Sequence, residues 1–267
     1  MSGEEQTGGG QYSEATLRAM QAAYGEGFLS PGGAAEVGDI LAGLSLDGLS
    51  VLDFGCGVGG ASLMLARDFG ARAVLGVDLE ARSLEQARAA AAAAGLAGRV
   101  DFRLVEPGPL PLPERDLDLV FSKDVICHIP DKAPVFAELF RVLRPGGLLA
   151  FADFVTDPAC DPTAFEAWLA GMEATGLRFR FEPFEVYLPA LTDAGFIDLE
   201  TQDHSNWSLE RCRQEIAHVE GPGRDALLAK LGPEGLQRRI ALTQRRLEAL
   251  KSGGLRHLHM RGRRPEG

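Results

Sequence analysis

A glycine-rich turn between a predicted strand and a predicted helix is the feature of the sequence best suited to ligand binding. The segment VLDFGCGVGG (51–60) runs from an apolar strand into closely spaced glycines, after which a helix begins. Glycine allows a tight turn and lets a ligand approach where a Cβ would clash. Asp78 ends the next predicted strand, where a carboxylate can accept both hydrogen bonds of a ribose diol. This pattern predicts a nucleoside-containing ligand, but a dinucleotide dehydrogenase would share both features.

Two further motifs separate the candidate classes. Asp53, two residues before the first glycine, completes a pattern that resembles the D/E-x-G-x-G signature of class I S-adenosylmethionine-dependent methyltransferases. The turn LRPGG (143–147) is also similar to theirs. A dehydrogenase should repeat its mononucleotide-binding half, and the sequence has no second glycine-rich strand–helix turn. The resemblance implies S-adenosylmethionine as cofactor, S-adenosylhomocysteine as its product, and seven strands of which the last is reversed.

A closer resemblance lies outside the glycine-rich turn. The segments QYSEATLRAMQAAYGEGFLSPGG (11–33) and SKDVICHI (122–129) look like the phosphoethanolamine N-methyltransferases. The likeness covers about residues 11–155 well and 183–203 loosely. Together with Asp53 and Gly57 of the signature, it implies these cofactor contacts: Gln11, Ser30 and Lys123 near the methionine end, Gly55 passing close to it, Asp78 on the ribose, Leu79 beside the adenine, and Glu106 on the adenine amino group, where the family has an Asp.

The same resemblance implies a catalytic pair, Tyr12 with His128. Methyl transfer from a sulfonium needs a neutral, aligned nucleophile, whereas an amine is mostly protonated near neutral pH. Histidine titrates in the range needed to accept that proton, and a tyrosine from the N-terminal lid can hold the imidazole and help exclude water. Asp124, four residues before His128, can orient the amine and stabilise the cation that forms. Outside this motif, His128 would be interpreted as structural and Asp124 as the cap of a turn.

The sequence departs from that family where the substrate phosphate should bind. The family surrounds the phosphate with tyrosines and basic groups, but this chain has three tyrosines, and Phe154 stands where the family usually has one. Trp168 and Met172 suggest an apolar wall in the segment that should cover the substrate. The remaining candidate anion partners are Arg178, Arg180, His257 and Arg261. We therefore expect a small amino acid or an uncharged amine to be a better substrate than phosphoethanolamine.

Charge and composition argue against several functions. With 27 Lys and Arg against 38 Asp and Glu, the net charge is −11, which disfavours binding along a nucleic-acid backbone. The basic stretch 237–251 is interpreted as a solvated helix face.

No apolar stretch is long enough to span a bilayer, and residues 1–10 have no signal-peptide core. The four cysteines form no CxxC pair, so neither a metal site nor disulfides are expected. We expect a cytoplasmic protein without nucleic-acid or membrane partners, and its oligomeric state stays open.

The order of predicted elements gives the fold class. Apolar strands alternate with helices, which is typical of a parallel sheet covered on both faces. Ser30-Pro31 predicts the N-cap of a helix that reaches about Leu44. We expect an α/β fold: a doubly wound, seven-stranded, Rossmann-like methyltransferase sheet with an N-terminal helical lid and a helical cap insertion. The predicted organisation is a disordered lead-in (1–10), lid helices (11–48), an S-adenosylmethionine-binding core (49–155), and a substrate cap with the C-terminal part of the same domain (156–267).

These observations favour one functional hypothesis and leave alternatives from other classes. The favoured function is S-adenosylmethionine-dependent transfer of a methyl group to the nitrogen of a small amine metabolite. An O- or S-methyltransferase acting on a small metabolite would keep the same cofactor site. A catalytically silent, cofactor-binding regulator is disfavoured by the intact Tyr12, Asp124 and His128. An RNA methyltransferase is disfavoured by the net charge and by the absence of an attached RNA-binding module.

Overall fold

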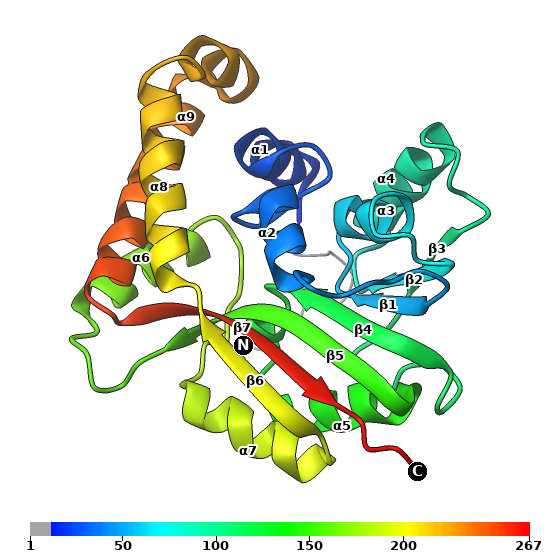
Figure 1. The fold of residues 1–267 in the computed structure, drawn as a ribbon. Helices are drawn as coiled ribbons and strands as arrows, with labels where there is room; N and C mark the ends of the chain where they lie inside the picture. Colours follow the sequence, from blue (N-terminus) through cyan, green and yellow to red (C-terminus); the bar gives the residue numbers. More distant parts are fainter. Residues whose placement is uncertain (1–11) are drawn as a thin grey trace, which may run out of the picture.

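A seven-stranded sheet forms the centre of the molecule (Figure 1). The computed structural model describes residues 12–267, so Gln11 and the predicted lead-in lie outside the described residues. The strand order is β3-β2-β1-β4-β5-β7-β6, in which β1 to β5 are parallel and β7 is antiparallel to both neighbours. This order confirms the predicted doubly wound sheet with a reversed last strand. The strands are β1 Ser50–Phe54, β2 Ala73–Asp78, β3 Val100–Leu104, β4 Leu117–Lys123, β5 Leu143–Thr156, β6 Ile197–Asp203 and β7 Leu255–Arg263.

Alternate residues of the strands face two separate cores. Val51 packs into the core formed with α2, α3 and α4, whereas its neighbour Leu52 packs into the core formed with α5 and α7. Successive side chains of a strand point to opposite faces, so burial on both faces explains the continuous apolar runs that predicted these strands. Figure 1 shows the two helical layers on either side of the sheet. These helices are α2 Gly33–Ile40, α3 Gly60–Arg67, α4 Ala81–Ala93, α5 Lys132–Val142 and α7 Phe184–Ala194.

The N-terminal lid differs from the prediction at its second helix. The expectation that Ser30 caps a helix reaching Leu44 is wrong, because α2 spans Gly33–Ile40 and has Gly32 at its N-cap. The Ser30 hydroxyl instead accepts a hydrogen bond of 2.6 Å from the Lys123 ammonium. A charged donor makes a stronger hydrogen bond than a neutral backbone N–H, so the contact with β4 takes the place of the cap.

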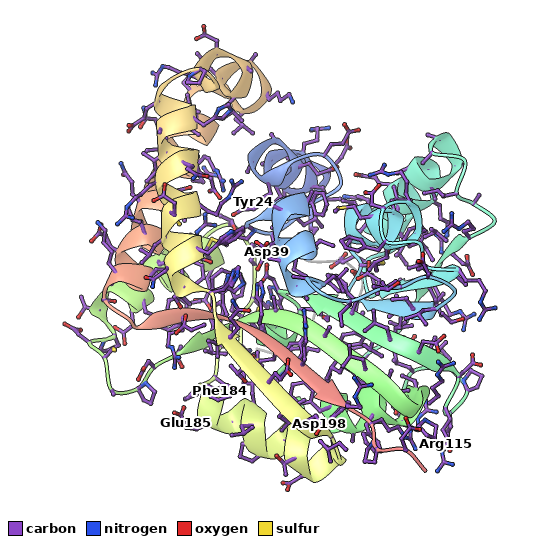
Figure 2. All side chains as sticks on the ribbon, viewed as in Figure 1. Tyr24, Asp39, Arg115, Phe184, Glu185 and Asp198 are labelled. Atoms are coloured by element: carbon purple, nitrogen blue, oxygen red, sulfur yellow. The ribbon has the colours of Figure 1, made fainter. Side chains whose placement is uncertain are left out.

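The helical cap follows β5 and packs against the first lid helix. Its helices are α6 Thr163–Glu173, α8 Ser205–Glu220 and α9 Arg224–Lys251, and α8 and α9 lie side by side in Figure 1. Tyr24, labelled in Figure 2, ends α1 (Glu14–Tyr24) and has the Arg239 guanidinium 4.4 Å from its ring centroid. Arg246 is only 4% exposed and shares the Glu215 carboxylate with Arg239, each at 2.7 Å. The interpretation of 237–251 as a solvated face is therefore wrong for these two arginines, which join the cap to the lid.

The long helix α9 is kinked near its middle. Gly232 has a φ of 70° and is followed by Pro233, which cannot donate a backbone hydrogen bond. The kink separates a short first part from the part that carries the buried arginines. No helix among residues 12–267 is both long and apolar enough to cross a membrane.

Candidate active site

The glycine-rich turn lies at the carboxyl end of β1, in the middle of the sheet. Gly55, Gly57 and Gly59 have φ values of 78°, 53° and 87°, which residues with side chains rarely adopt. A Cβ on Gly55 would lie 2.3 Å from the Val125 side chain, so the turn packs directly against the loop after β4. Glycine is therefore required here, and it presents backbone to the edge of the sheet where ligands of such folds bind.

Asp78 holds the glycine-rich turn from the end of β2. Its carboxylate accepts hydrogen bonds from the N–H groups of Gly57 at 2.7 Å and Glu80 at 3.0 Å. Burial raises the pKa of Asp78, and these two N–H groups oppose that shift. Each carboxylate oxygen has further acceptor capacity, which fits a ribose diol. Leu79 beside it is 55% exposed, and Glu106 is exposed just after β3.

Asp53, the acid of the signature, faces the interior of the protein. Its carboxylate is 2% exposed and accepts a hydrogen bond of 2.5 Å from the Ser62 hydroxyl on α3. Burial raises the pKa of Asp53 to about 7, although the Ser62 hydrogen bond acts in the opposite direction. This contact joins β1 to α3 beneath the turn, so Asp53 supports the shape of the turn from below.

The lid lies directly on the glycine-rich turn. The Gly60 N–H donates to the Gly27 carbonyl at 3.0 Å, and a Cβ on Gly60 would lie 2.3 Å from that oxygen. A Cβ on Gly57 would lie 3.0 Å from the side chain of Leu29. The segment between α1 and α2 therefore covers the first turn of α3, as expected of a lid that closes over a cofactor.

Lys123 and Asp124, at the end of β4, are both buried in contact with the lid. The Lys123 ammonium donates to the Ser30 hydroxyl and the Pro31 carbonyl, each at 2.6 Å, and to Asp124 at 2.8 Å. Burial would lower the pKa of Lys123, but the Asp124 and Glu36 carboxylates outweigh it and raise the pKa to about 12. Asp124 has a φ of 57°, which is uncommon without glycine. The structure thus brings Ser30 and Asp124 together around the Lys123 ammonium.

His128 follows β4 on a short 3-10 helix, Ile126–His128. Its Nδ1 lies 2.6 Å from the Arg178 carbonyl, and its ring stacks on Phe179 with centroids 4.5 Å apart. Because a carbonyl can only accept, Nδ1 carries a proton, and in the neutral ring the lone pair lies on Nε2. Burial lowers the pKa of His128, against the opposing effect of the Arg178 carbonyl. The ring is therefore neutral at physiological pH and can accept a proton at Nε2.

Tyr12 lies in the same part of the structure as His128. It packs against a cluster formed by Cys127, Leu177 and Phe179, and Phe179 is the residue that stacks on His128. The first described residue of the chain therefore meets the loop after β4 and the segment between α6 and α7. Tyr12 and His128 are therefore both close to Phe179.

Glu36, a fully buried carboxylate on α2, was not among the site residues predicted from the sequence. Its Oε1 lies 2.8 Å from His257 Nε2 and 3.4 Å from His259 Nε2, and one donor atom from each residue falls within 4.8 Å of the others. The Lys123 ammonium lies 2.9 Å from Glu36 Oε2, so this carboxylate belongs to a cluster of ion pairs and is not assigned as a metal ligand. The available signal was an acidic residue one helical turn before Ile40, on the buried face of α2.

Two residues expected to bind an anion are engaged elsewhere. His257 pairs with Glu36, and its ring stacks on Phe154 with centroids 4.0 Å apart. Arg261 donates to two backbone carbonyls at the end of α2, at 2.7 and 2.8 Å. The prediction of anion partners is therefore wrong for His257 and Arg261.

An aromatic stack extends from His128 into the cap. The Phe179 ring stacks on the ring of His128 and also on the ring of Phe181. The Phe179 and Phe181 centroids are 4.9 Å apart. Trp168 lies 5.4 Å from Phe181 and 6.3 Å from Phe154, again between centroids. The surroundings of the candidate base on the cap side are thus apolar.

Comparison with known proteins agrees with this fold. A family model described as a methyltransferase domain matches residues 52–151. Phosphoethanolamine N-methyltransferase 1 of Arabidopsis thaliana is 28% identical over 211 residues, which cover 79% of this chain and 41% of that protein. Methyltransferase GfsG of Streptomyces halstedii is 37% identical over 190 residues, which cover 71% of this chain and 66% of that protein. The chain spans about two fifths of the length of the plant enzymes it matches.

Solved structures show the same fold. Phosphoethanolamine N-methyltransferase 2 of Haemonchus contortus superposes with a TM-score of 0.87 at 24% identity, covering 96% of this chain and 59% of that chain. That structure contains phosphomonomethylethanolamine and S-adenosylhomocysteine, and a second structure of the enzyme contains S-adenosyl-L-methionine.

The sheet order, the glycine-rich turn and the family match together define a class I S-adenosylmethionine-dependent methyltransferase, and the chain belongs to this class. Within the class it resembles the phosphoethanolamine N-methyltransferases, and its cofactor is S-adenosylmethionine. The residues present fit that cofactor, since Asp78 has acceptor capacity for a ribose and Leu79 offers exposed apolar surface beside it.

Proposed function

We propose that this methyltransferase acts on the nitrogen of a small amine, with His128 as the proton acceptor. The observation that carries the proposal is the orientation of the His128 ring. Its Nδ1–H is fixed on the Arg178 carbonyl at 2.6 Å, which leaves Nε2 as the basic nitrogen, and burial keeps the ring neutral at physiological pH. A base near the operating pH is what an amine needs before it can act as a nucleophile.

The cofactor, His128 and solvent together account for every bond and proton of the methyl transfer. The bound cofactor supplies an electrophilic methyl group on a sulfonium sulfur; the C–S bond breaks as the N–C bond forms, giving S-adenosylhomocysteine. His128 Nε2 takes the proton that the amine must lose, and it releases that proton to solvent after turnover. Asp124, a buried carboxylate held in its position by Lys123, stabilises the ammonium before and after transfer. Tyr12 closes the site above His128 and excludes water.

The cofactor contacts form the second part of the proposal. Asp78 takes the ribose diol, Leu79 and Glu106 lie beside the adenine, and Gly55 and Gly57 let the ligand approach the backbone closely. Ser30 and Lys123 define the methionine end, and Asp53 acts by supporting the turn. Gln11, proposed for the same end, lies outside the described residues.

The acceptor is proposed to carry no phosphate. A phosphate dianion in a closed site must exchange its water shell for several charge-assisted hydrogen bonds. Near His128 the cap offers an aromatic stack, Arg261 binds backbone carbonyls, and Arg246 is paired with Glu215. An amine with an apolar body, or a small amino acid held by an exposed arginine such as Arg180, matches these groups better.

O-methylation of a hydroxylated natural product is a second candidate. It is favoured by the aromatic stack and by the similarity to 27-O-demethylrifamycin SV methyltransferase of Amycolatopsis mediterranei, 29% identical over 185 residues. His128 would serve equally well here, because a hydroxyl must also lose a proton to become a good nucleophile.

A substrate panel scored by S-adenosylhomocysteine release separates these functions. We expect turnover with dephosphorylated amines or amino acids, and kcat/KM for phosphoethanolamine below the best of them. A lead of about tenfold or more for phosphoethanolamine, about 1.4 kcal/mol in transition-state binding, would restore the substrate named for the plant relatives. Turnover with hydroxylated acceptors alone favours the second candidate, and cofactor binding without turnover on any acceptor favours a regulator.

A further inference from the structure

Four charged side chains from three separate parts of the chain form one buried ion cluster: Glu36 on α2, Lys123 and Asp124 at the end of β4, and His257 on β7. Glu36 lies 2.8 Å from His257 Nε2 through one oxygen and 2.9 Å from Lys123 Nζ through the other. Asp124 lies 2.8 Å from Lys123 Nζ and 3.4 Å from His257 Nε2 in the same way. Each carboxylate therefore faces both cations, and the four side chains are at most 6% exposed.

The ion cluster is neutral only when His257 is protonated on both ring nitrogens. Two carboxylates and one ammonium leave a negative charge, and an unpaired buried charge is strongly disfavoured. The Ser208 hydroxyl, 2.6 Å from His257 Nδ1, accepts the second ring proton. Burial lowers the pKa of His257, but Glu36 and Asp124 outweigh it and raise the pKa to about 9. His257 is therefore an imidazolium at neutral pH.

Two further histidines, His259 and His204, lie beside the ion cluster. His259 Nε2 lies 3.4 Å from the Glu36 carboxylate, and the His259 ring stacks on His204 with centroids 3.8 Å apart. Burial and the neighbouring histidines lower the pKa of His204. The His257 ring stacks on the ring of Phe154. Among the described residues, its one other ring contact is with His259 on the same strand. The positive charge belongs to His257, because this histidine contacts both carboxylates.

The ion cluster holds the lid segment, residues 30–36, at both ends. Lys123 Nζ binds the Ser30 hydroxyl and the Pro31 carbonyl at the first end, and His257 binds Glu36 at the other. The lid segment follows directly on the residues that lie against the glycine-rich turn. Loss of the His257 proton leaves two carboxylates around one ammonium, and their repulsion favours release of the segment.

We propose that His257 is a positioning residue for cofactor binding: its imidazolium bridges Glu36 and Asp124, which keeps the lid segment in place and with it the preceding residues that lie against the glycine-rich turn. It acts through Glu36 and does not contact the acceptor. The inference goes beyond the proposed N-methylation and holds whichever atom is methylated. Because the folded-state pKa of about 9 lies above the ordinary value of 6.5, the contribution of His257 is complete below pH 6.5 and is lost as pH rises through 9.

Calorimetric titration with S-adenosylhomocysteine across about pH 6.5 to 10 tests this proposal, spanning the ordinary and the raised pKa. The wild-type Kd should rise as pH passes about 9. His257→Gln keeps hydrogen bonding but loses the charge, so it should weaken binding at neutral pH about 10-fold, a usual coupling, and lose the high-pH dependence. His259→Gln, the matched control, should keep both. The assay uses no acceptor, so its failure is distinct from failure of the proposed methylation.

A second variant keeps the imidazole and changes only its pKa. Ser208→Ala removes the acceptor of the Nδ1 proton, so the high-pH midpoint should move down by about 0.5–1 pH unit. Amide-exchange protection of the lid segment should fall over the same pH range in the wild type. The proposal is overturned if Ser208→Ala leaves the midpoint unchanged, or if His257→Gln binds like the wild type and keeps its pH dependence.

Discussion

The Nδ1 atom of His128 lies 2.6 Å from the backbone carbonyl of Arg178, a contact between the loop after β4 and the segment that joins α6 to α7. A backbone oxygen therefore sets the tautomer of the candidate base, and Phe179 next to it sets the plane of the ring. The same segment adds to the apolar surface of the cap. The segment proposed to shape the acceptor site thus also orients the ring of the proposed base.

Replacement of His128 should affect turnover far more than cofactor affinity. His128→Ala is expected to lower kcat by about 10²–10⁴-fold, the usual contribution of a positioned general base. The Kd for S-adenosylhomocysteine, measured by calorimetry, should change little because His128 is proposed to act on the acceptor and not on the cofactor. His218→Ala, at an exposed histidine on α8, is the control and should leave kcat unchanged. A fully active but poorly folded His128→Ala protein would show that the histidine is structural.

The pH profile of kcat/KM should report the same histidine. Burial lowers the pKa of His128, so its basic form persists to a lower pH than in a free histidine. The rate should therefore be independent of this group at neutral pH and fall on the acidic side, with a midpoint below the ordinary value of about 6.5. His128→Ala should lack that acidic limb. An acidic limb that survives in the variant would assign it to another group.

Asp78 should contribute to cofactor affinity through two hydrogen bonds. Asp78→Ala is expected to weaken S-adenosylhomocysteine binding by about 1.5–3 kcal/mol for each charged hydrogen bond lost. Asp116→Ala removes an exposed carboxylate just before β4, at the opposite edge of the sheet, and should leave the affinity unchanged. Since Asp78 also accepts the Gly57 N–H, thermal unfolding must be measured beside calorimetry. Equal affinities in both variants would remove Asp78 from the cofactor site.

The elements that position the site could be predicted from local patterns. β1 and β4 are continuous apolar runs bounded by glycine or a charged residue, so each could be predicted as a strand. Gly95, with a φ of 68°, ends the alanine-rich α4 as an αL cap would. Such signals depend on residues within a few positions of one another. They can therefore be recognised without knowledge of the tertiary structure.

The ion pairs could not be predicted in this way. Glu36 and His257 are more than two hundred positions apart, and neither leaves a periodic signal that names the other. Arg246 lies in a strongly basic stretch, and only the approach of Glu215 and Tyr24 decides that it is buried. Ser30 has the right neighbour for an N-cap, but Lys123 competes for its hydroxyl. In each case a long-range charge overrides the local preference.

The contact between the lid and the turn predicts a steric effect at Gly60. A Cβ there would lie 2.3 Å from the Gly27 carbonyl, so Gly60→Ala should push the lid away and weaken S-adenosylhomocysteine binding. Gly38→Ala is the matched control, because it adds a Cβ to a helical glycine of the lid with nothing within 4 Å. The control should stabilise the protein by about 0.5–1 kcal/mol through helix propensity. If Gly60→Ala instead gains stability without loss of affinity, the lid does not press on the turn.

The buried arginine of α9 should contribute to stability through its charge pairing. Arg246→Met leaves Glu215 with Arg239 as its remaining partner, so the cost should be about 3 kcal/mol, the lower end for breaking a buried ion pair. Arg238→Met, at an exposed neighbour, should stay within about 0.5 kcal/mol of the wild type in urea unfolding. Adding Glu215→Gln to Arg246→Met removes both charges, so the double variant should lose about 0.5–3 kcal/mol less than the sum of the single losses. Strict additivity would mean that Arg246 contributes packing alone, and the salt bridge between the cap helices would then have no measurable part in holding Tyr24 and the lid.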